Sequence, residues 1–151
     1  MTAVVGTRLP RREDPALLTG EAQFVADLAV PGVLHAALVR SPIAHARIIS
    51  IDLAPALALP GVVAAFTGSD LQQDWAGPLP CAWPVTADMK SPPHLPLAVG
   101  KVCYAGDAVA VVVARTEYQA QDAVAAVLVD YEPLNPVVDL ETAAITMPGV
   151  Q

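Results

Sequence analysis

The sequence predicts an α+β fold, with a small mixed sheet, two or three short helices and a long proline-rich loop. Short β-rich runs separated by turn residues recur along the chain, and most of them precede the first strong helical pattern. A strand, a helix and a second strand follow one another clearly only within residues 108–132, whereas a doubly wound sheet would repeat this unit. At 151 residues the chain has the length of one domain, so we expect residues 1–151 to form a single domain.

Residues 1–30 predict an extended N-terminal arm. Within it, residues 6–30 mix charged side chains with Pro10, Pro15 and Gly20. Only residues 14–18 favour a short helical turn. Because prolines interrupt regular backbone hydrogen bonding, no long helix or strand is expected before residue 31.

Apolar and β-branched residues then gather in short runs that have the composition of strands. The run at residues 108–114 is apolar throughout, which predicts a buried strand. The runs at residues 33–40 and 47–51 are separated by the Ser41-Pro42 break, and we expect them to be neighbouring strands. Further strands are expected at residues 62–66 and 127–132.

Two helices have recognisable signals at their N-terminal ends. Asp52 can cap a short helix over residues 53–59, which the Pro60-Gly61 pair would end. Thr116 and Gln119 have the spacing of a capping box, in which each side chain bonds the backbone N–H of the other residue. The helix that follows is expected to turn an apolar stripe inward, made of Ala120, Ala123, Val124 and Val127.

Residues 68–100 predict a long excursion over the surface. Six prolines in this segment remove backbone donors and prevent regular ladders. The segment also contains Trp75, Cys81 and Trp83, and disordered linkers seldom carry such residues. We therefore expect a loop that is packed against something.

The composition excludes several classes of partner. The formal net charge is −7 and the basic residues cluster only at Arg8, Arg11 and Arg12, which is a poor match to a nucleic-acid backbone. The apolar run at residues 108–114 is far shorter than the roughly 20 residues of a membrane-spanning helix. Charged residues soon after Met1 do not suit a secretory signal, so we expect a cytoplasmic protein. Only 15% of residues are charged, which predicts apolar surface facing a partner.

Short motifs stand in a characteristic order along the chain. They are Arg11-Arg12-Glu13-Asp14-Pro15, Leu18-Thr19-Gly20, Val39-Arg40-Ser41-Pro42, Ala44-His45-Ala46-Arg47-Ile48, Pro60-Gly61-Val62, Val102-Cys103-Tyr104-Ala105-Gly106, Val109-Ala110 and Val129-Asp130-Tyr131-Glu132-Pro133-Leu134. Together they resemble the start of the molybdenum hydroxylase large subunits, the family of xanthine dehydrogenase, aldehyde oxidase and aerobic carbon monoxide dehydrogenase. The resemblance runs from about residue 6 to about residue 144. It is nearest to the carbon-monoxide-dehydrogenase-like branch over residues 6–20.

The resemblance implies a hammerhead-type domain that braces the molybdenum-binding domains of an oxidoreductase. By the same resemblance, the whole enzyme carries a molybdopterin-type molybdenum cofactor, with iron–sulfur clusters and FAD in partner components. It hydroxylates a substrate carbon or oxidises carbon monoxide, with water as the oxygen source. The family's molybdopterin contacts and its catalytic base lie in domains beyond residue 151, so this chain is expected to hold no cofactor and to be inactive alone. We expect a truncated piece of a larger subunit, able to self-associate in isolation.

Three polar side chains are candidates for contacts with neighbouring domains. His45 lies between small residues, which favours a buried histidine bonded to main chain, with an interdomain contact as the alternative. Arg40 and Arg47 flank a tight turn. Either can hold a carboxylate of a neighbouring domain, or form an exposed ion pair of little value.

Trp75 and Trp83 complete the candidate contact residues, because both are large apolar side chains in a loop. Cys81 and Cys103 lack a nearby second cysteine or an activating histidine in the sequence, so we expect buried, inert thiols. No spacing of His35, His45 and His94 suits a metal site.

Two other classes of function remain as alternatives. One is a freestanding module that binds a small molecule or another protein. The other is a small hydrolase using Asp70, Cys81 and His94, which the sequence disfavours because no nucleophile elbow or activated pair is visible.

Overall fold

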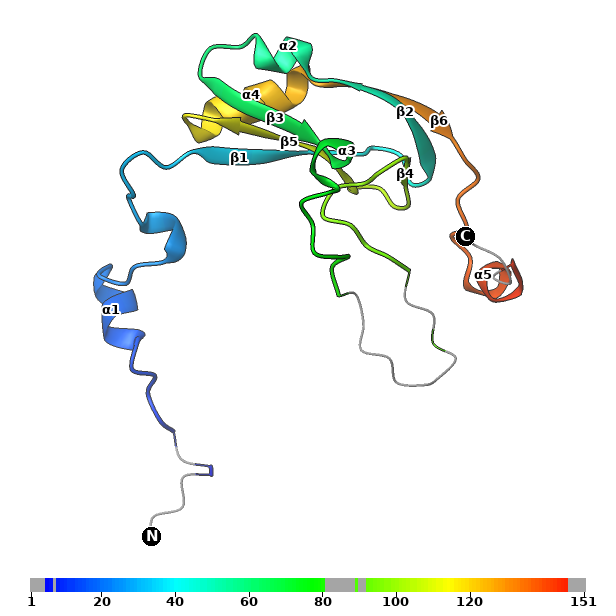
Figure 1. Ribbon diagram of the computed structural model, residues 1–151. Helices are drawn as coiled ribbons and strands as arrows, with labels where there is room; N and C mark the ends of the chain where they lie inside the picture. Colours follow the sequence, from blue (N-terminus) through cyan, green and yellow to red (C-terminus); the bar gives the residue numbers. More distant parts are fainter. Residues whose placement is uncertain (1–4, 7, 81–88, 90–91, 147–151) are drawn as a thin grey trace. The chain divides into compact units, whose positions relative to one another are not determined.

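The computed structural model describes residues 5–6, 8–80, 89 and 92–146 (Figure 1). The chain divides into two compact units, an N-terminal unit of residues 1–33, which contains the arm (residues 1–30), and a main unit of residues 34–151. The arm holds a short helix, α1 (Asp14–Thr19), and a 3-10 turn, η1 (Val25–Asp27). The Arg11 side chain pairs with Asp14 (Nε to Oδ1, 3.0 Å) at the start of α1, and Gly20 ends the helix in the left-handed region at φ 75°. The predicted helical turn in the arm is therefore confirmed.

The first sheet of the main unit, sheet A, has three strands in the order β1 (His35–Arg40), β5 (Ala108–Ala114) and β3 (Val62–Thr67). Both neighbours pair antiparallel with β5. Helix α4 (Glu117–Ala126) packs on one face of this sheet (Figure 1). The contact is close because its residues are small: buried Ala120 of α4 meets Ala37 and Ala114 of the sheet.

The second sheet, sheet B, has the order β4 (Lys101–Val102), β2 (Ala46–Asp52) and β6 (Leu128–Pro133), again with antiparallel pairs. The expectation that residues 33–40 and 47–51 form neighbouring strands was wrong, because β1 and β2 lie in different sheets. The physical reason lies at Ser41, whose backbone bonds residues just before β5. The chain leaves sheet A there before it enters β2. The α+β fold is confirmed, with the expected strands divided between two small sheets.

The other helices of the main unit are one or two turns long: α2 (Ala54–Leu57), α3 (Gly68–Leu71) and α5 (Leu140–Thr146). Helix α2 is shorter than the expected 53–59, and its N-cap is Leu53, but Asp52 Oδ1 still accepts a hydrogen bond from Ala54 N–H (2.9 Å) at the helix start. Helix α3 lies where the sequence predicts only loop, and Thr67 with Asp70 forms a capping box at its start. None of the helices that the structure describes has the length and apolar character needed to cross a membrane.

The core of the main unit lies between the two sheets and α4. Its largest fully buried side chains are Val102, Val109 and Val112. The predicted proline-rich excursion is anchored to this core at its far end, where Leu97 is buried and Ala98 N–H donates to Ala108 O (2.6 Å). Its near end is α3, whose first residue, Gly68, lies so close to the backbone of Ala98 that a side chain would not fit. Both ends of the excursion are thus fixed by sheet A.

Candidate functional site

The turn after β1 is held by main-chain bonds to the segment before β5. Ser41 N–H donates to Asp107 O (2.8 Å), and Gly106 N–H donates to Ser41 O (2.7 Å). The exposed Arg40 side chain donates from Nη1 to Gly106 O (2.8 Å). Among the described residues Arg40 forms no ion pair. It therefore braces this turn, and a contact from Arg40 to another domain stays a prediction.

A buried carboxylate and a half-buried phenol lie beside this turn. Asp107 is only 7% exposed, and its Oδ2 accepts from Cys103 N–H (3.1 Å). Burial raises the pKa of the Tyr131 hydroxyl above its ordinary value of 10.0, a hydrogen bond with the Ser41 side chain lowers this pKa, and the negative charge of Asp107 raises it. Ser41 and Asp107 belong to the end of sheet A and Tyr131 belongs to sheet B. The cluster is therefore a polar joint between the two sheets.

His45 lies just before β2 and bonds main chain through its ring. Its Nδ1 lies 3.1 Å from Asn135 O, so Nδ1 carries the proton in this contact. Its own carbonyl accepts from Leu134 N–H (2.8 Å). The expected bond from His45 to main chain is confirmed, although the side chain is half-buried rather than fully enclosed.

Arg47 forms a cross-strand ion pair in sheet B. Its Nη1 lies 3.4 Å from Glu132 Oε2, and the two side chains are 63% and 54% exposed. The strand register places Arg47 directly opposite Glu132, which explains the pair. Arg47 thus follows the expected alternative of a solvent-exposed ion pair, which contributes little to stability.

The aromatic and cysteine candidates divide between described and undescribed residues. Trp75 is half-buried in the segment after α3. Trp83 and Cys81 lie outside the described residues. Cys103 is a free and exposed thiol, so the expectation that it is buried was wrong. It follows the short edge strand β4, where its backbone N–H donates to Asp107 and its side chain lies at the surface.

The residues of the hydrolase alternative have other roles in the structure. Asp70 accepts from Thr67 N–H (2.8 Å) and from the Thr67 hydroxyl (2.7 Å), and these bonds lower the pKa of its carboxyl group. The His94 ring stacks on Tyr104, with ring centroids 5.8 Å apart. Within the part of the chain that the structure describes, no three His, Cys, Asp or Glu side chains are placed to hold a metal ion. These residues do not fit a molybdenum or iron–sulfur site, and we assign no redox step to them.

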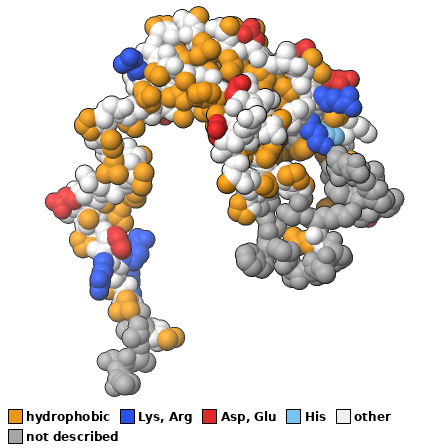
Figure 2. All heavy atoms as spheres, viewed as in Figure 1, with side chains coloured by type: hydrophobic (Ala, Val, Ile, Leu, Met, Phe, Trp, Pro, Cys, Tyr) orange, Lys and Arg blue, Asp and Glu red, His pale blue; other side chains and the backbone are white. Residues whose placement is uncertain are grey.

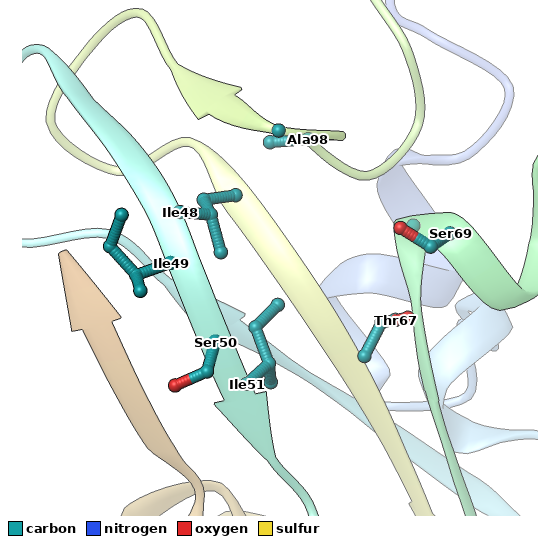
Figure 3. A pocket seen from close by; sticks show the side chains of 9 residues that line it. Ile48, Ile49, Ser50, Ile51, Thr67, Ser69 and Ala98 are labelled. Atoms are coloured by element: carbon teal, nitrogen blue, oxygen red, sulfur yellow. The ribbon is translucent and has the colours of Figure 1, made fainter. Parts of the chain in front are cut away.

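Two shallow hollows lie on the main unit. The first, of about 250 Å³, lies between β2 and the start of α3. Ile48 and Ile51 point into it, and Ile49 and Ser50 point away (Figure 3). The second, of about 290 Å³, is lined by residues of β1, α4 and β6 together with Pro42. Both are below the roughly 300–1,000 Å³ typical of small-molecule sites.

The sequence did not indicate a further surface, the face of sheet A opposite α4. Leu38 of β1 and Phe66 of β3 are 41% and 38% exposed on it. Between them lies Val111 of β5, which is half-buried although the whole run 108–114 was expected to be buried. An entirely apolar strand has no alternation that would reveal an exposed face, so period alone could not find it.

Comparison with known proteins identifies the family to which the chain belongs. Residues 19–135 match the family described as "Aldehyde oxidase and xanthine dehydrogenase, a/b hammerhead domain". The 6-hydroxypseudooxynicotine dehydrogenase complex subunit gamma of Paenarthrobacter nicotinovorans is 41% identical over 148 residues, covering 93% of this chain and 18% of that protein. Quinoline 2-oxidoreductase from Pseudomonas putida 86 has a similar structure, with a TM-score of 0.84 and 42% identity over 92% of this chain and 17% of its own.

A structure of the Cu,Mo-CO dehydrogenase is also similar, with a TM-score of 0.78 and 39% identity over 91% of this chain and 16% of its own. The chain thus spans less than a fifth of the length of these relatives. Fold, order of motifs and match to the family model all agree. The chain belongs to the aldehyde oxidase and xanthine dehydrogenase family, and the part it contains is the family's a/b hammerhead domain.

Proposed function

We propose that this chain is a structural and docking domain of the large subunit of a molybdenum hydroxylase, and that it performs no redox chemistry by itself. The observation that carries the proposal is the match of more than nine-tenths of this chain to less than a fifth of each of the three relatives named above. In this proposal the remaining domains of the large subunit supply the reaction centre. The cytoplasmic location expected from the sequence stays a prediction.

Apolar residues left exposed in the arm support a docking role. Neither α1 nor η1 contains a buried residue. A set of large apolar side chains in the arm lies open to solvent: Leu9, Leu17, Leu18, Phe24, Val25, Leu28 and Val30. Clustered exposed apolar surface is uncommon on proteins that act as monomers. We infer that the arm meets other domains, together with the proline-rich excursion and the candidates Arg40, His45, Arg47, Trp75 and Trp83.

The cofactors of the whole enzyme belong to the proposal as well. One similar structure is named as a copper and molybdenum enzyme. We place a molybdenum cofactor in the remaining domains of the large subunit, and iron–sulfur clusters and FAD in partner components. The part that the described residues play is mechanical: the two sheets and α4 form a rigid block whose outer surfaces position their neighbours.

The alternative of a freestanding small-molecule module has less support. Both hollows are shallow and small for a drug-sized ligand, and no charged side chain lines the first of them. No described feature of these hollows favours a particular ligand.

A domain replacement tests the proposal. The chain is inserted into quinoline 2-oxidoreductase from Pseudomonas putida 86 in place of the segment that it matches, and a deletion of the same segment serves as the control. We expect the replacement to restore assembly of the enzyme, measured by native mass, and quinoline oxidation. A deletion variant that assembles and turns over quinoline like the intact enzyme would overturn the docking role.

A further inference from the structure

One face of sheet A carries an uninterrupted apolar strip across all three strands. The strand register sets Leu38, Val111 and Phe66 side by side in one row. In the next row it aligns Ala36, Val113 and Ala64 in the same way. Because side chains on paired strands share a face at each register position, these six residues form one surface, here named the outer face.

The outer face is only partly covered within the chain. The opposite face of sheet A is covered, since Ala37, Val112 and Ala114, which alternate with the outer-face residues, are buried beneath α4 or in the core. On the outer face itself, Leu38 and Phe66 are exposed and Val111 and Val113 are half-buried. Figure 2 shows hydrophobic side chains gathered over β1, β5 and β3. A three-stranded sheet with one covered face and one open apolar face is incomplete as a packing unit.

The chemistry of the outer face restricts what can cover it. All six side chains are hydrocarbon, so a charged group placed against the centre would lose its hydration without gaining a partner. The backbone of the central strand β5 is already paired on both sides. A partner therefore gains mainly from burial of apolar area.

We propose that the outer face is the surface on which an apolar element of the remaining large subunit packs. This inference rests on the proposed function and adds to it the face and the chemistry of the partner. The length of the relatives indicates the occupant: each of the three relatives named above carries more than four-fifths of its chain outside the matched segment, and that polypeptide is present in every copy of those proteins. It is a partner joined covalently, so packing on this face carries little loss of translational freedom.

Accessibility of single cysteines tests the inference. In a background with Cys81→Ser and Cys103→Ser, a maleimide probe is directed to Leu38→Cys and Phe66→Cys on the outer face. Tyr118→Cys on α4 is the matched control, since Tyr118 is 83% exposed away from this face. Labelling rates are read by peptide mass spectrometry in the isolated chain at low concentration, and in the quinoline 2-oxidoreductase that carries the chain as its hammerhead domain.

We expect both outer-face positions to label readily in the isolated chain and about tenfold or more slowly in the assembled enzyme, because labelling then requires local opening of the interface. Tyr118→Cys should label at the same rate in both. If all three positions label at the same rate in the assembled enzyme as in the isolated chain, this inference is overturned and the proposed function is left intact. Protection that grows with concentration in both proteins would identify a second copy as the occupant and also overturn it. A replacement enzyme that does not assemble would overturn the proposed function, and this inference with it.

Discussion

Single residues in this domain act mainly by satisfying backbone groups at turns. Arg40 donates to Gly106 O, His45 lies within hydrogen-bonding distance of Asn135 O and Asp52 accepts from Ala54 N–H. The side-chain types in the sequence suggested the bond of His45 and the ion-pair alternative for Arg47. The exposed thiol of Cys103 was not predictable, since its exposure depends on where the short strand β4 ends.

Tyr131 predicts a dependence of stability on alkaline pH. Its pKa in the folded state is raised, mainly by burial, so the folded protein favours the neutral phenol. The stabilising contribution is therefore complete below pH 10.0, the ordinary pKa, and is lost as the pH rises through the higher folded-state value. We expect the free energy of unfolding, measured in urea, to fall above pH 10 and to fall less steeply in Tyr131→Phe. Tyr118→Phe, at an exposed helix position, is the control, and an equal change of slope in both variants would count against the role of Tyr131.

We predict a second single-residue effect on stability, at Gly61. Its φ is +87°, and a Cβ at this position would collide with the side-chain amide of Gln119. Gly106 has a φ of +95° with open space around its missing Cβ, so it reports backbone strain alone. We expect Gly106→Ala to lower the free energy of unfolding by roughly 1–2 kcal/mol. Gly61→Ala should lower it by a similar amount, because the atoms that its Cβ would meet are the far end of the flexible Gln119 side chain, which can move aside. A clearly larger loss at Gly61, recovered by Gln119→Ala in that background, would show instead that the Gln119 side chain is held in place.

At the scale of elements, the sequence placed the strands well and the helix starts in part. Of the two hydrogen bonds expected in the capping box of α4, only one forms. Thr116 accepts from Gln119 N–H (3.3 Å), as expected, but Gln119 does not return the bond. Its side chain lies against Gly61, and its buried Oε1 has no hydrogen-bond partner among the residues that the structure describes. A contact from a segment more than 50 residues earlier in the chain outweighs the local capping box here, which no local pattern can reveal.

The cap of α4 is open to a direct test. Thr116→Ala removes the oxygen that accepts from Gln119 N–H, and we expect a loss of about 1 kcal/mol in the free energy of unfolding. Thr116→Ser keeps an oxygen at the same distance from the backbone and should retain most of the stability. Urea midpoints at unchanged slope measure both effects. A Thr116→Ala midpoint equal to that of the parent would show that this cap contributes nothing.

On the scale of the whole molecule, the order of the motifs identified the family, but the pairing of the strands into sheets could not be predicted. The outer face escaped detection because the residues of β5 are apolar on both sides. Likewise, residues 33–40 and 47–51 are close in sequence, yet long-range bonds at Ser41 send them into separate sheets. Such choices depend on segments as far apart as His35 and Ala114, 79 residues, which local composition does not encode.

We predict a contrast in hydrogen-exchange rates within the isolated chain. The amides of Ala110 and Val112 lie in the central strand of sheet A, and that of Ala98 donates to Ala108 O, so all three should exchange slowly. Residues 8–30 of the arm contain no buried residue within their helices and should exchange fast at low concentration. Exchange measured by mass spectrometry at several concentrations checks this. Strong protection of the arm in a monomer would show that it is self-sufficient and would weaken the docking proposal.

The central position of β5 also affects how the chain is made. Strands β1 and β3 leave the ribosome many residues before β5, the one strand that pairs with them among the described residues, is synthesised. Until residue 114 has emerged, both have open hydrogen-bonding edges and apolar side chains, and contacts of such long sequence separation form slowly. During this interval the nascent chain is open to misfolding and aggregation. Any stop of translation before β5 yields a product with no sheet A. The first two-thirds of this domain therefore cannot complete their fold until the last third has been synthesised.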